Sequence, residues 1–151
     1  MLLVDDSIVR GTTSKEIVQM ARDAGANKVY MASAAPPVRF PNVYGIDMPT
    51  KDELVAHNRT NEQIREIIGC DALIYQDVDA MKAAIFKLAP KSVNGNPVVT
   101  GFDASCFDGV YVTGDITGDD INRLRDSRVE SSKKAEDAED SSRLALPNPV
   151  E

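Results

Sequence analysis

Two adjacent carboxylates near the start of the chain, Asp5 and Asp6, are the side chains best suited to chemistry. They follow the apolar residues MLLV and precede a short segment that ends in Gly11-Thr12-Thr13-Ser14. This pattern predicts a buried strand with two acids at its carboxyl end, then a turn whose amides and hydroxyls can hold a phosphate. Such a site suits a phosphorylated sugar with a divalent cation. The alternative is that the acids only cap the turn.

The elements that must position these acids alternate between strand and helix patterns. Strands are expected at residues 1–5, 28–33 and 71–76, and helices at 13–24, 50–56, 60–68 and 78–88. Capping boxes at residues 50–53 and 60–63 start two of these helices, Gly69 ends one of them, and Asp77 caps the last. The first strand, helix and strand form a βαβ unit, which implies a parallel pair and a right-handed crossover. The fold class is therefore α/β. The residues expected on buried helix faces are Ile17, Met20, Ala21, Ala24, Ile64, Ile67, Ile68, Met81, Ala84, Ile85 and Leu88.

The remaining segments have weaker patterns. Residues 32–49 contain four prolines, which exclude a regular helix and predict a long ordered loop. A turn and a short strand are expected at 107–113, and one or two helical turns at 119–125. The polar segment from residue 127 onward is expected to be a frayed helix or disordered. We therefore divide the chain at residues 1–93, 94–126 and 127–151.

Composition limits the class of protein. The chain has 151 residues, a net charge of -7 and two cysteines. The negative charge argues against binding to nucleic acid or to an anionic membrane surface. We find no apolar run long enough to cross a membrane and no signal peptide, and two cysteines make no disulfide framework. We expect a cytoplasmic protein. Because a strand apolar on both faces needs neighbours, we also expect a piece of a longer protein.

The opening motif resembles a known family. Asp5-Asp6 followed by SIVRGTT is similar to the phosphoribosyl-pyrophosphate (PRPP) signature of type I phosphoribosyltransferases. The segments LLVDDSIVRGTTS, KVYMASAAPPVRFPNVYGIDMP, ELVAHNR, IREIIGCDALIYQD and FDGVYVT together resemble the glutamine PRPP amidotransferase (amidophosphoribosyltransferase) family. The resemblance implies an incomplete type I phosphoribosyltransferase-like parallel sheet at residues 1–93, with 94–126 as a carboxyl-terminal extension packed on it and 127–151 as a tail. The family's glutaminase domain and its early strands would lie before residue 1.

The same resemblance implies an activity and a site. Members of the family use glutamine-derived ammonia to convert PRPP into 5-phosphoribosylamine, in the first committed step of purine synthesis. It implies a Mg²⁺ site at Asp5 and Asp6, inhibition by purine nucleotides such as AMP or GMP, and a homotetramer. The implied PRPP-binding residues are Asp5, Asp6, Ser7, Val9, Arg10, Gly11, Thr12 and Thr13. The catalytic cysteine of the glutaminase domain would not be among these residues, so we expect little or no activity from the chain alone.

Some members of the family carry an iron–sulfur cluster, and this chain resembles the branch without one. Asn42 stands where such members have a cysteine after the motif's proline, and Asp103 stands three positions before Cys106. One thiolate cannot hold a cluster. Two further readings stay open: a non-catalytic PRPP- or nucleotide-binding module, and a truncated subunit that associates with a full-length partner.

Several other residues carry both a structural and a functional interpretation. Arg39, Tyr44 and Asp47 lie in the proline-rich loop and could line the site or an ammonia path, although a structural role is favoured for each. His57 is the only histidine, and we expect a packing role for it. The two cysteines are expected to be small buried apolar groups.

Overall fold

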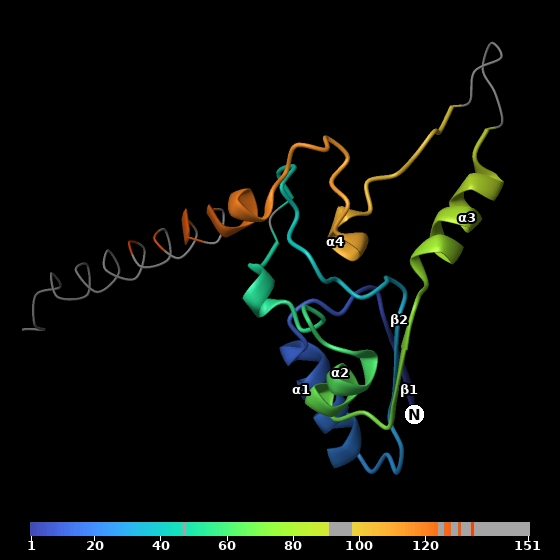
Figure 1. Cartoon of the computed structure of the whole chain (residues 1–151). Coiled ribbons are helices and arrows are strands. Elements are labelled where there is room, and N and C mark those ends of the chain that lie inside the picture. Colours follow the sequence, from blue (N-terminus) through green and yellow to red (C-terminus); the bar gives the residue numbers. More distant parts are fainter. Residues whose placement is uncertain (47, 91–97, 124–125, 128–129, 131–133, 135–151) are drawn as a thin grey trace, which may run out of the picture. The chain divides into compact units, whose positions relative to one another are not determined.

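The computed structural model describes residues 1–46, 48–90, 98–123, 126–127, 130 and 134. The chain divides into two compact units, Met1–Asp115 and Ile116–Glu151. The elements of the first unit are shown in Figure 1. In chain order they are β1 (Leu2–Asp5), α1 (Thr12–Asp23), β2 (Tyr30–Ser33), the 3-10 helix η1 (Lys51–Glu53), α2 (Asn61–Ile68), β3 (Ala72–Tyr75), α3 (Val78–Leu88) and α4 (Ser105–Asp108).

The three strands form a parallel sheet in the order β1-β2-β3. Leu3 of β1 is in register with Met31 of β2, which is in register with Leu73 of β3. Helices α1 and α2 lie side by side on one face of this sheet (Figure 1). The α/β class and the parallel pairing expected from the sequence are confirmed.

The core lies between that sheet face and the two helices. Its members include Val18 of α1, Met31 of β2, and Ile64 and Ile68 of α2, each at most 2% exposed. Leu3 and Leu73 contact this cluster from the sheet. Burial of these apolar side chains is the main force that orients α1, and with it the start of α1, against the end of β1.

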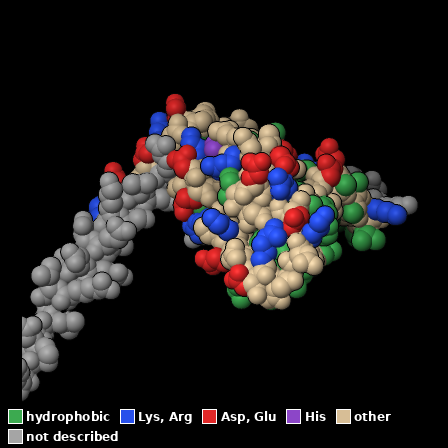
Figure 2. All heavy atoms as spheres, turned by 90° about the horizontal axis from the view of Figure 1, so that it is seen from below, with side chains coloured by type: hydrophobic (Ala, Val, Ile, Leu, Met, Phe, Trp, Pro, Cys, Tyr) green, Lys and Arg blue, Asp and Glu red, His purple; other side chains and the backbone are tan. Residues whose placement is uncertain are grey.

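The opposite face of the sheet is apolar and exposed. Leu2, Val4 and Ile74 are 58%, 71% and 56% exposed, and their register places them on the face away from α1 and α2. Within the described residues β1 is an edge strand, so the expected second neighbour of β1 is not found there. In the space-filling view, hydrophobic side chains are visible at the surface, and charges of both signs mix across it (Figure 2).

Two of the expected helix faces are only partly correct: Ala21 of α1 is buried as expected, but Ala24 is exposed. In α1 the buried residues are Ser14, Val18 and Ala21, whereas Met20 is 69% exposed and Ile17 is half exposed. The contact with the sheet is centred on Val18, and a helical turn of 3.6 residues then carries Met20 to the solvent side. In α2 the expected Ile64 and Ile68 are buried, and Ile67 is exposed.

Helix α3 has no buried residues, so the expected burial of Met81, Ala84, Ile85 and Leu88 is wrong. Among the described residues its contacts are peripheral: Phe86 meets Phe102 edge to face, and the Lys82 ammonium lies 3.2 Å from an oxygen of Asp108. Its apolar periodicity is real, but no layer of the described chain covers that side of the helix.

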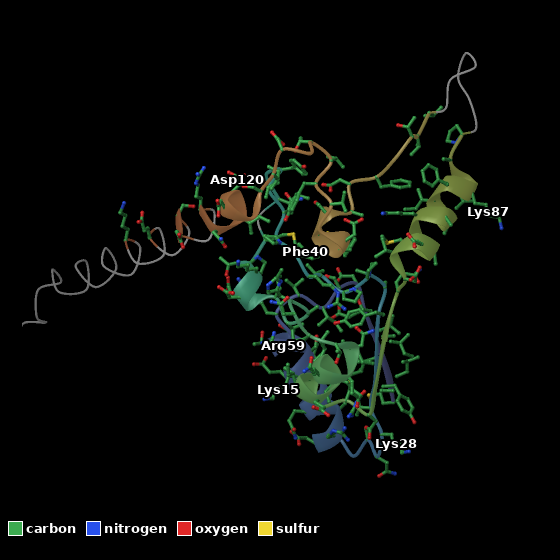
Figure 3. The ribbon with its side chains drawn as sticks, viewed as in Figure 1. Lys15, Lys28, Phe40, Arg59, Lys87 and Asp120 are labelled. Atoms are coloured by element: carbon green, nitrogen blue, oxygen red, sulfur yellow. The ribbon has the colours of Figure 1, made fainter. Side chains whose placement is uncertain are left out.

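The short strand expected at 110–113 is also wrong. Residues 110–113 form neither strand nor helix; the short helix α4 ends just before them, and Val110 and Val112 are 68% and 62% exposed. Tyr111 joins this segment to the proline-rich loop, because its buried hydroxyl donates a hydrogen bond of 2.8 Å to the carbonyl of Pro41. Gly109 ends α4 at φ 74°, where an added Cβ would lie 2.9 Å from the ring of Phe40, a residue labelled in Figure 3. Loop-to-loop packing replaces the strand.

The second unit is described over fewer residues. Residues 118–123 are helical, and Thr117 before them donates from its amide and its hydroxyl to the Asp120 carboxylate at 2.9 and 2.6 Å. Most of the expected tail at 127–151 lies outside the described residues, as does the end of the expected helix at 124–125. None of the helices described is long and apolar enough to cross a membrane.

Candidate functional site

An open pocket of about 400 Å³ lies at the carboxyl end of β1. All eight residues expected at the site line it, and Ser14 and Pro49 line it as well. Ile8, in the middle of the motif, points the other way and is 1% exposed in the core. The buried Ile8 therefore holds the loop on the protein while its neighbours face the pocket. The lining residues are Asp5, Asp6, Ser7, Val9, Arg10, Gly11, Thr12, Thr13, Ser14 and Pro49.

The two carboxylates are oriented by the backbone that follows them. The amide of Asp6 donates to Oδ1 of Asp5 at 2.9 Å, and the amide of Ser7 donates to Oδ1 of Asp6 at 2.6 Å. Asp5 is half-buried at the end of β1, and Asp6 is exposed. Both side chains therefore have a fixed direction while remaining accessible to a ligand in the pocket.

The amino end of α1 is open to an anion. Its N-cap residue is Gly11, at φ 78°, which supplies no side-chain cap, and the first turn contains no acidic residue. Helix α2, by contrast, is capped by Thr60 and has Glu62 in its first turn, and α3 is capped by Asp77. The free amides and the positive end of the α1 dipole are thus left for a ligand, and anions such as phosphate bind at helix ends of this kind.

Arg10 lines the pocket, but its guanidinium is held by another side chain. Nε and Nη2 of Arg10 each lie 3.1 Å from Oε1 of Glu53. The backbone of Arg10 is therefore better placed than its side chain to serve a bound anion.

The residues at the site fit a magnesium ion with two protein ligands. No cluster of three or more His, Cys, Asp or Glu side chains able to hold a metal occurs in the part of the chain that the structure describes. Mg²⁺ typically takes one or two carboxylates and completes its shell with water and substrate phosphates. Asp5 and Asp6 would supply the two carboxylates, and a phosphorylated ligand would supply the rest.

The other residues singled out in the sequence have structural contacts. Nη1 of Arg39 donates to the carbonyls of Ala56 and Arg59, both at 2.8 Å, and the Tyr44 hydroxyl bonds to the Thr113 hydroxyl at 3.0 Å. Nδ1 of His57 lies 2.8 Å from the Arg39 carbonyl. None of these side chains lines the pocket. Asp47 lies outside the described residues.

Both cysteines behave as apolar groups. Cys70 is 1% exposed in the core and Cys106 is half-buried. Desolvation raises the pKa of each thiol above its ordinary value. A raised pKa keeps a thiol protonated and unreactive at neutral pH.

Ser14 and Pro49 are the pocket residues missing from the sequence-based set. Ser14 directly follows Gly11, Thr12 and Thr13 in the GTTS sequence, so its position next to three expected site residues could have identified it. Pro49 comes from the proline-rich loop and reaches the pocket only through the tertiary fold, so no local pattern identifies it.

Comparison with known proteins supports this interpretation of the fold. No model of a protein family matches the chain. The amidophosphoribosyltransferase of Pasteurella multocida is 51% identical over 148 residues, which cover 98% of this chain and 28% of that protein. The Escherichia coli protein of the same name is 48% identical, with the same two coverages. A solved B. subtilis glutamine PRPP amidotransferase, complexed with ADP and GMP, matches with a TM-score of 0.58 and 40% identity over 74% of this chain and 23% of that one.

The three-stranded parallel sheet with its helices is therefore part of a phosphoribosyltransferase-like α/β fold. The resemblance to the amidophosphoribosyltransferase family is confirmed, and this chain is homologous to a segment of those proteins. It spans 28% of the length of the two curated relatives named above.

Proposed function

We propose that this chain carries the ribose 5-phosphate half of a PRPP site in a glutamine-dependent amidophosphoribosyltransferase. The whole reaction converts PRPP, glutamine and water into 5-phosphoribosylamine, glutamate and pyrophosphate. One observation carries the proposal: two oriented carboxylates and the uncapped amino end of α1 open into the same pocket. The proposal is supported by the sequence identity of 48–51% with two amidophosphoribosyltransferases over 98% of this chain.

In this proposal the chain binds and orients the sugar. The amides of Gly11, Thr12 and Thr13 hold the 5′-phosphate, and Asp5 and Asp6 accept hydrogen bonds from the ribose 2′- and 3′-hydroxyls. Ammonia forms a bond to C1 as the bond from C1 to the pyrophosphate oxygen breaks, and the electron pair leaves with pyrophosphate. The new ammonium group then loses one proton to water, which gives the neutral amine. Positive charge develops on the ribose as that bond lengthens, and two nearby carboxylates stabilise it. A bound Mg²⁺ would supply charge neutralisation for the leaving pyrophosphate.

The chain alone is expected to lack the complete activity. By family resemblance, the groups for the pyrophosphate end and for glutamine hydrolysis belong to segments not represented in these 151 residues. We therefore expect no glutaminase activity and little or no transferase activity from the purified chain. Glutamine-dependent release of pyrophosphate, well above background, would contradict this part of the proposal.

Titration of the full chain with ribose 5-phosphate, with and without Mg²⁺, tests the site. We expect Asp5→Asn and Asp6→Asn each to weaken binding about tenfold, because each removes a charged hydrogen-bond acceptor. Asp23→Asn, at the other end of α1, is the matched control and should bind as the original chain does. Equal affinities for all four proteins would show that the ribose does not contact these carboxylates.

A second candidate is a nucleotide-binding module without catalysis. The observation that favours it is the related B. subtilis structure, which is a complex with ADP and GMP. Titration with AMP and GMP separates the two candidates: nucleotide binding that is unaffected by Asp5→Asn and Asp6→Asn would favour this second function. Size-exclusion chromatography of the same samples would test the expected homo-oligomer.

A further inference from the structure

The loop at residues 9–13, which we propose holds the 5′-phosphate and call the phosphate loop, is held by a segment distant in sequence, residues 50–55. Val55 donates a backbone hydrogen bond of 2.9 Å to the carbonyl of Val9. The carboxylate of Glu53 binds the guanidinium of Arg10, which lies 43 positions away in the chain. The side chain of Val55 also covers Gly11, where an added Cβ would lie 3.0 Å from Cγ2. Three consecutive loop residues thus contact this one segment.

Glu53 uses its two carboxylate oxygens for different tasks. Oε1 binds Arg10, while Oε2 accepts from the amide and the hydroxyl of Thr50 at 2.9 and 3.0 Å. These Thr50 contacts orient the carboxylate at the start of η1. The Thr50 amide is the largest influence that lowers the pKa of Glu53, so the side chain is ionised at neutral pH and its charge is available to Arg10.

The end of this segment and the residue after it are packed into the protein. Leu54, Val55 and Ala56 are at most 4% exposed. Nη1 of Arg59, a residue labelled in Figure 3, lies 3.4 and 3.1 Å from the carbonyls of Leu54 and Val55. Nη1 of Arg39 donates to the carbonyl of Ala56 at 2.8 Å. A buried backbone with its carbonyls satisfied by two arginines cannot shift easily.

We infer that Glu53 and Val55 are positioning residues for the phosphate loop. Neither lines the pocket, and both act through the loop residues that do. Val55 packs against Gly11 at the start of α1, where an added Cβ would lie, and Glu53 holds the Arg10 side chain so that the loop presents backbone amides to the anion. The inference rests on the proposed phosphate site for its purpose, but the contacts that carry it are independent of any ligand.

Glu53→Gln is the variant that removes the charge holding Arg10 without removing the capping bond, and another part of this chain shows why. In the second capping box of this protein, Gln63 stands at the equivalent position, and its Oε1 accepts from the Thr60 amide at 2.9 Å. Glutamine at position 53 can therefore keep the bond to the Thr50 amide while losing the charge that holds Arg10. Glu62→Gln is the matched control, because Glu62 pairs with Arg65 at 2.7 Å on α2 and does not line the pocket.

Amide hydrogen exchange of the full chain tests the inference without a ligand. The reporters are the amides of Lys15, bonded to Gly11, and Val55, bonded to Val9. We expect Glu53→Gln to speed exchange at both about threefold, the size of an exposed ion pair, and Glu62→Gln to leave both unchanged. In an Arg10→Ala background, Glu53→Gln should add nothing further. Unchanged exchange in Glu53→Gln, or an equal effect in Glu62→Gln, would overturn the inference.

Titration with ribose 5-phosphate connects the inference to binding. Glu53→Gln should weaken binding about threefold, in step with the looser loop. Tighter binding would mean that Glu53 withholds Arg10 from the phosphate, which would also overturn the positioning role. If the original chain binds no ribose 5-phosphate but the exchange rates change as expected, the proposed function fails while the positioning of the loop stands.

Discussion

Gly11→Ala is the sharpest test of how the phosphate loop is built. Gly11 is at φ 78°, where an alanine costs about 1–2 kcal/mol in backbone strain. Its new Cβ would also lie 3.0 and 3.2 Å from Cγ2 and Cβ of Val55, which is 4% exposed and has little room to move. That contact adds about 1–2 kcal/mol of overpacking. We expect the free energy of unfolding to fall by about 2–4 kcal/mol in total.

Gly69→Ala is the matched control for this prediction. Gly69 is at φ 82°, and an added Cβ would meet nothing within 4 Å. The free energy of unfolding of Gly69→Ala should therefore fall by the backbone strain alone, about 1–2 kcal/mol. The difference between the two variants isolates the contact with Val55.

Urea unfolding followed by far-ultraviolet circular dichroism is the suitable assay, because the chain contains no tryptophan. Equal losses in Gly11→Ala and Gly69→Ala would refute the reasoning, since they would mean that the loop moves away from Val55 at no cost. Gly11→Ala should also weaken binding of ribose 5-phosphate, and Gly69→Ala should not.

Two further predictions concern contacts away from the pocket. The pKa of Asp71 is lowered, first by the hydrogen bond from the Val29 amide and then by Arg22. The ionised Asp71 carboxylate therefore stabilises the fold at pH values above the ordinary aspartate pKa, and this stabilisation is lost as pH falls through the lowered pKa. Asp71→Asn should therefore unfold more easily at neutral pH, and the difference should narrow in acid. Tyr111→Phe removes the buried bond to Pro41 and should lower the free energy of unfolding by about 1 kcal/mol.

Each of these two predictions has its own check. For Asp71→Asn, urea midpoints that differ from the original chain by the same amount at about pH 7 and about pH 3 would contradict the ionic origin of the effect. For Tyr111→Phe, the control is Tyr44→Phe, because the Tyr44 hydroxyl bonds to Thr113 at an exposed position. A Tyr44→Phe variant as destabilised as Tyr111→Phe would show that burial of the hydroxyl is not the cause.

Local sequence patterns predicted the helix ends well. Helix α2 begins after the Thr60 capping box and ends at Gly69, at φ 82°, and α3 begins after Asp77, whose side chain accepts from the Ala80 amide at 2.8 Å. Each of these signals acts over three or four residues, so it does not depend on the rest of the chain. The three expected strands and the helices α1, α2 and α3 are found in the expected order, whereas the helix expected at 50–56 is only the 3-10 helix η1, Lys51–Glu53.

The buried faces could not be predicted in this way. The apolar spacing of Met20 and Leu88 was read correctly as helical, yet both side chains are largely exposed, at 69% and 86%. Periodicity defines a stripe on a helix, but the stripe that is buried depends on where the sheet lies and on what covers the helix. The expected strand at 110–113 failed similarly, because the buried bond between Tyr111 and Pro41 joins two loops 70 residues apart.

The sequence alone predicted the pocket residues between Asp5 and Thr13, which exclude the buried Ile8, because a strand end and a helix start separated by one turn must lie together. Only the tertiary structure decided which distant residues complete the pocket and hold its loop. Pro49 lines the pocket, Glu53 binds the Arg10 guanidinium, and Val55 packs against Gly11. These contacts arise from packing between segments about 40 residues apart, and no local spacing encodes which distant side chain will fill that space.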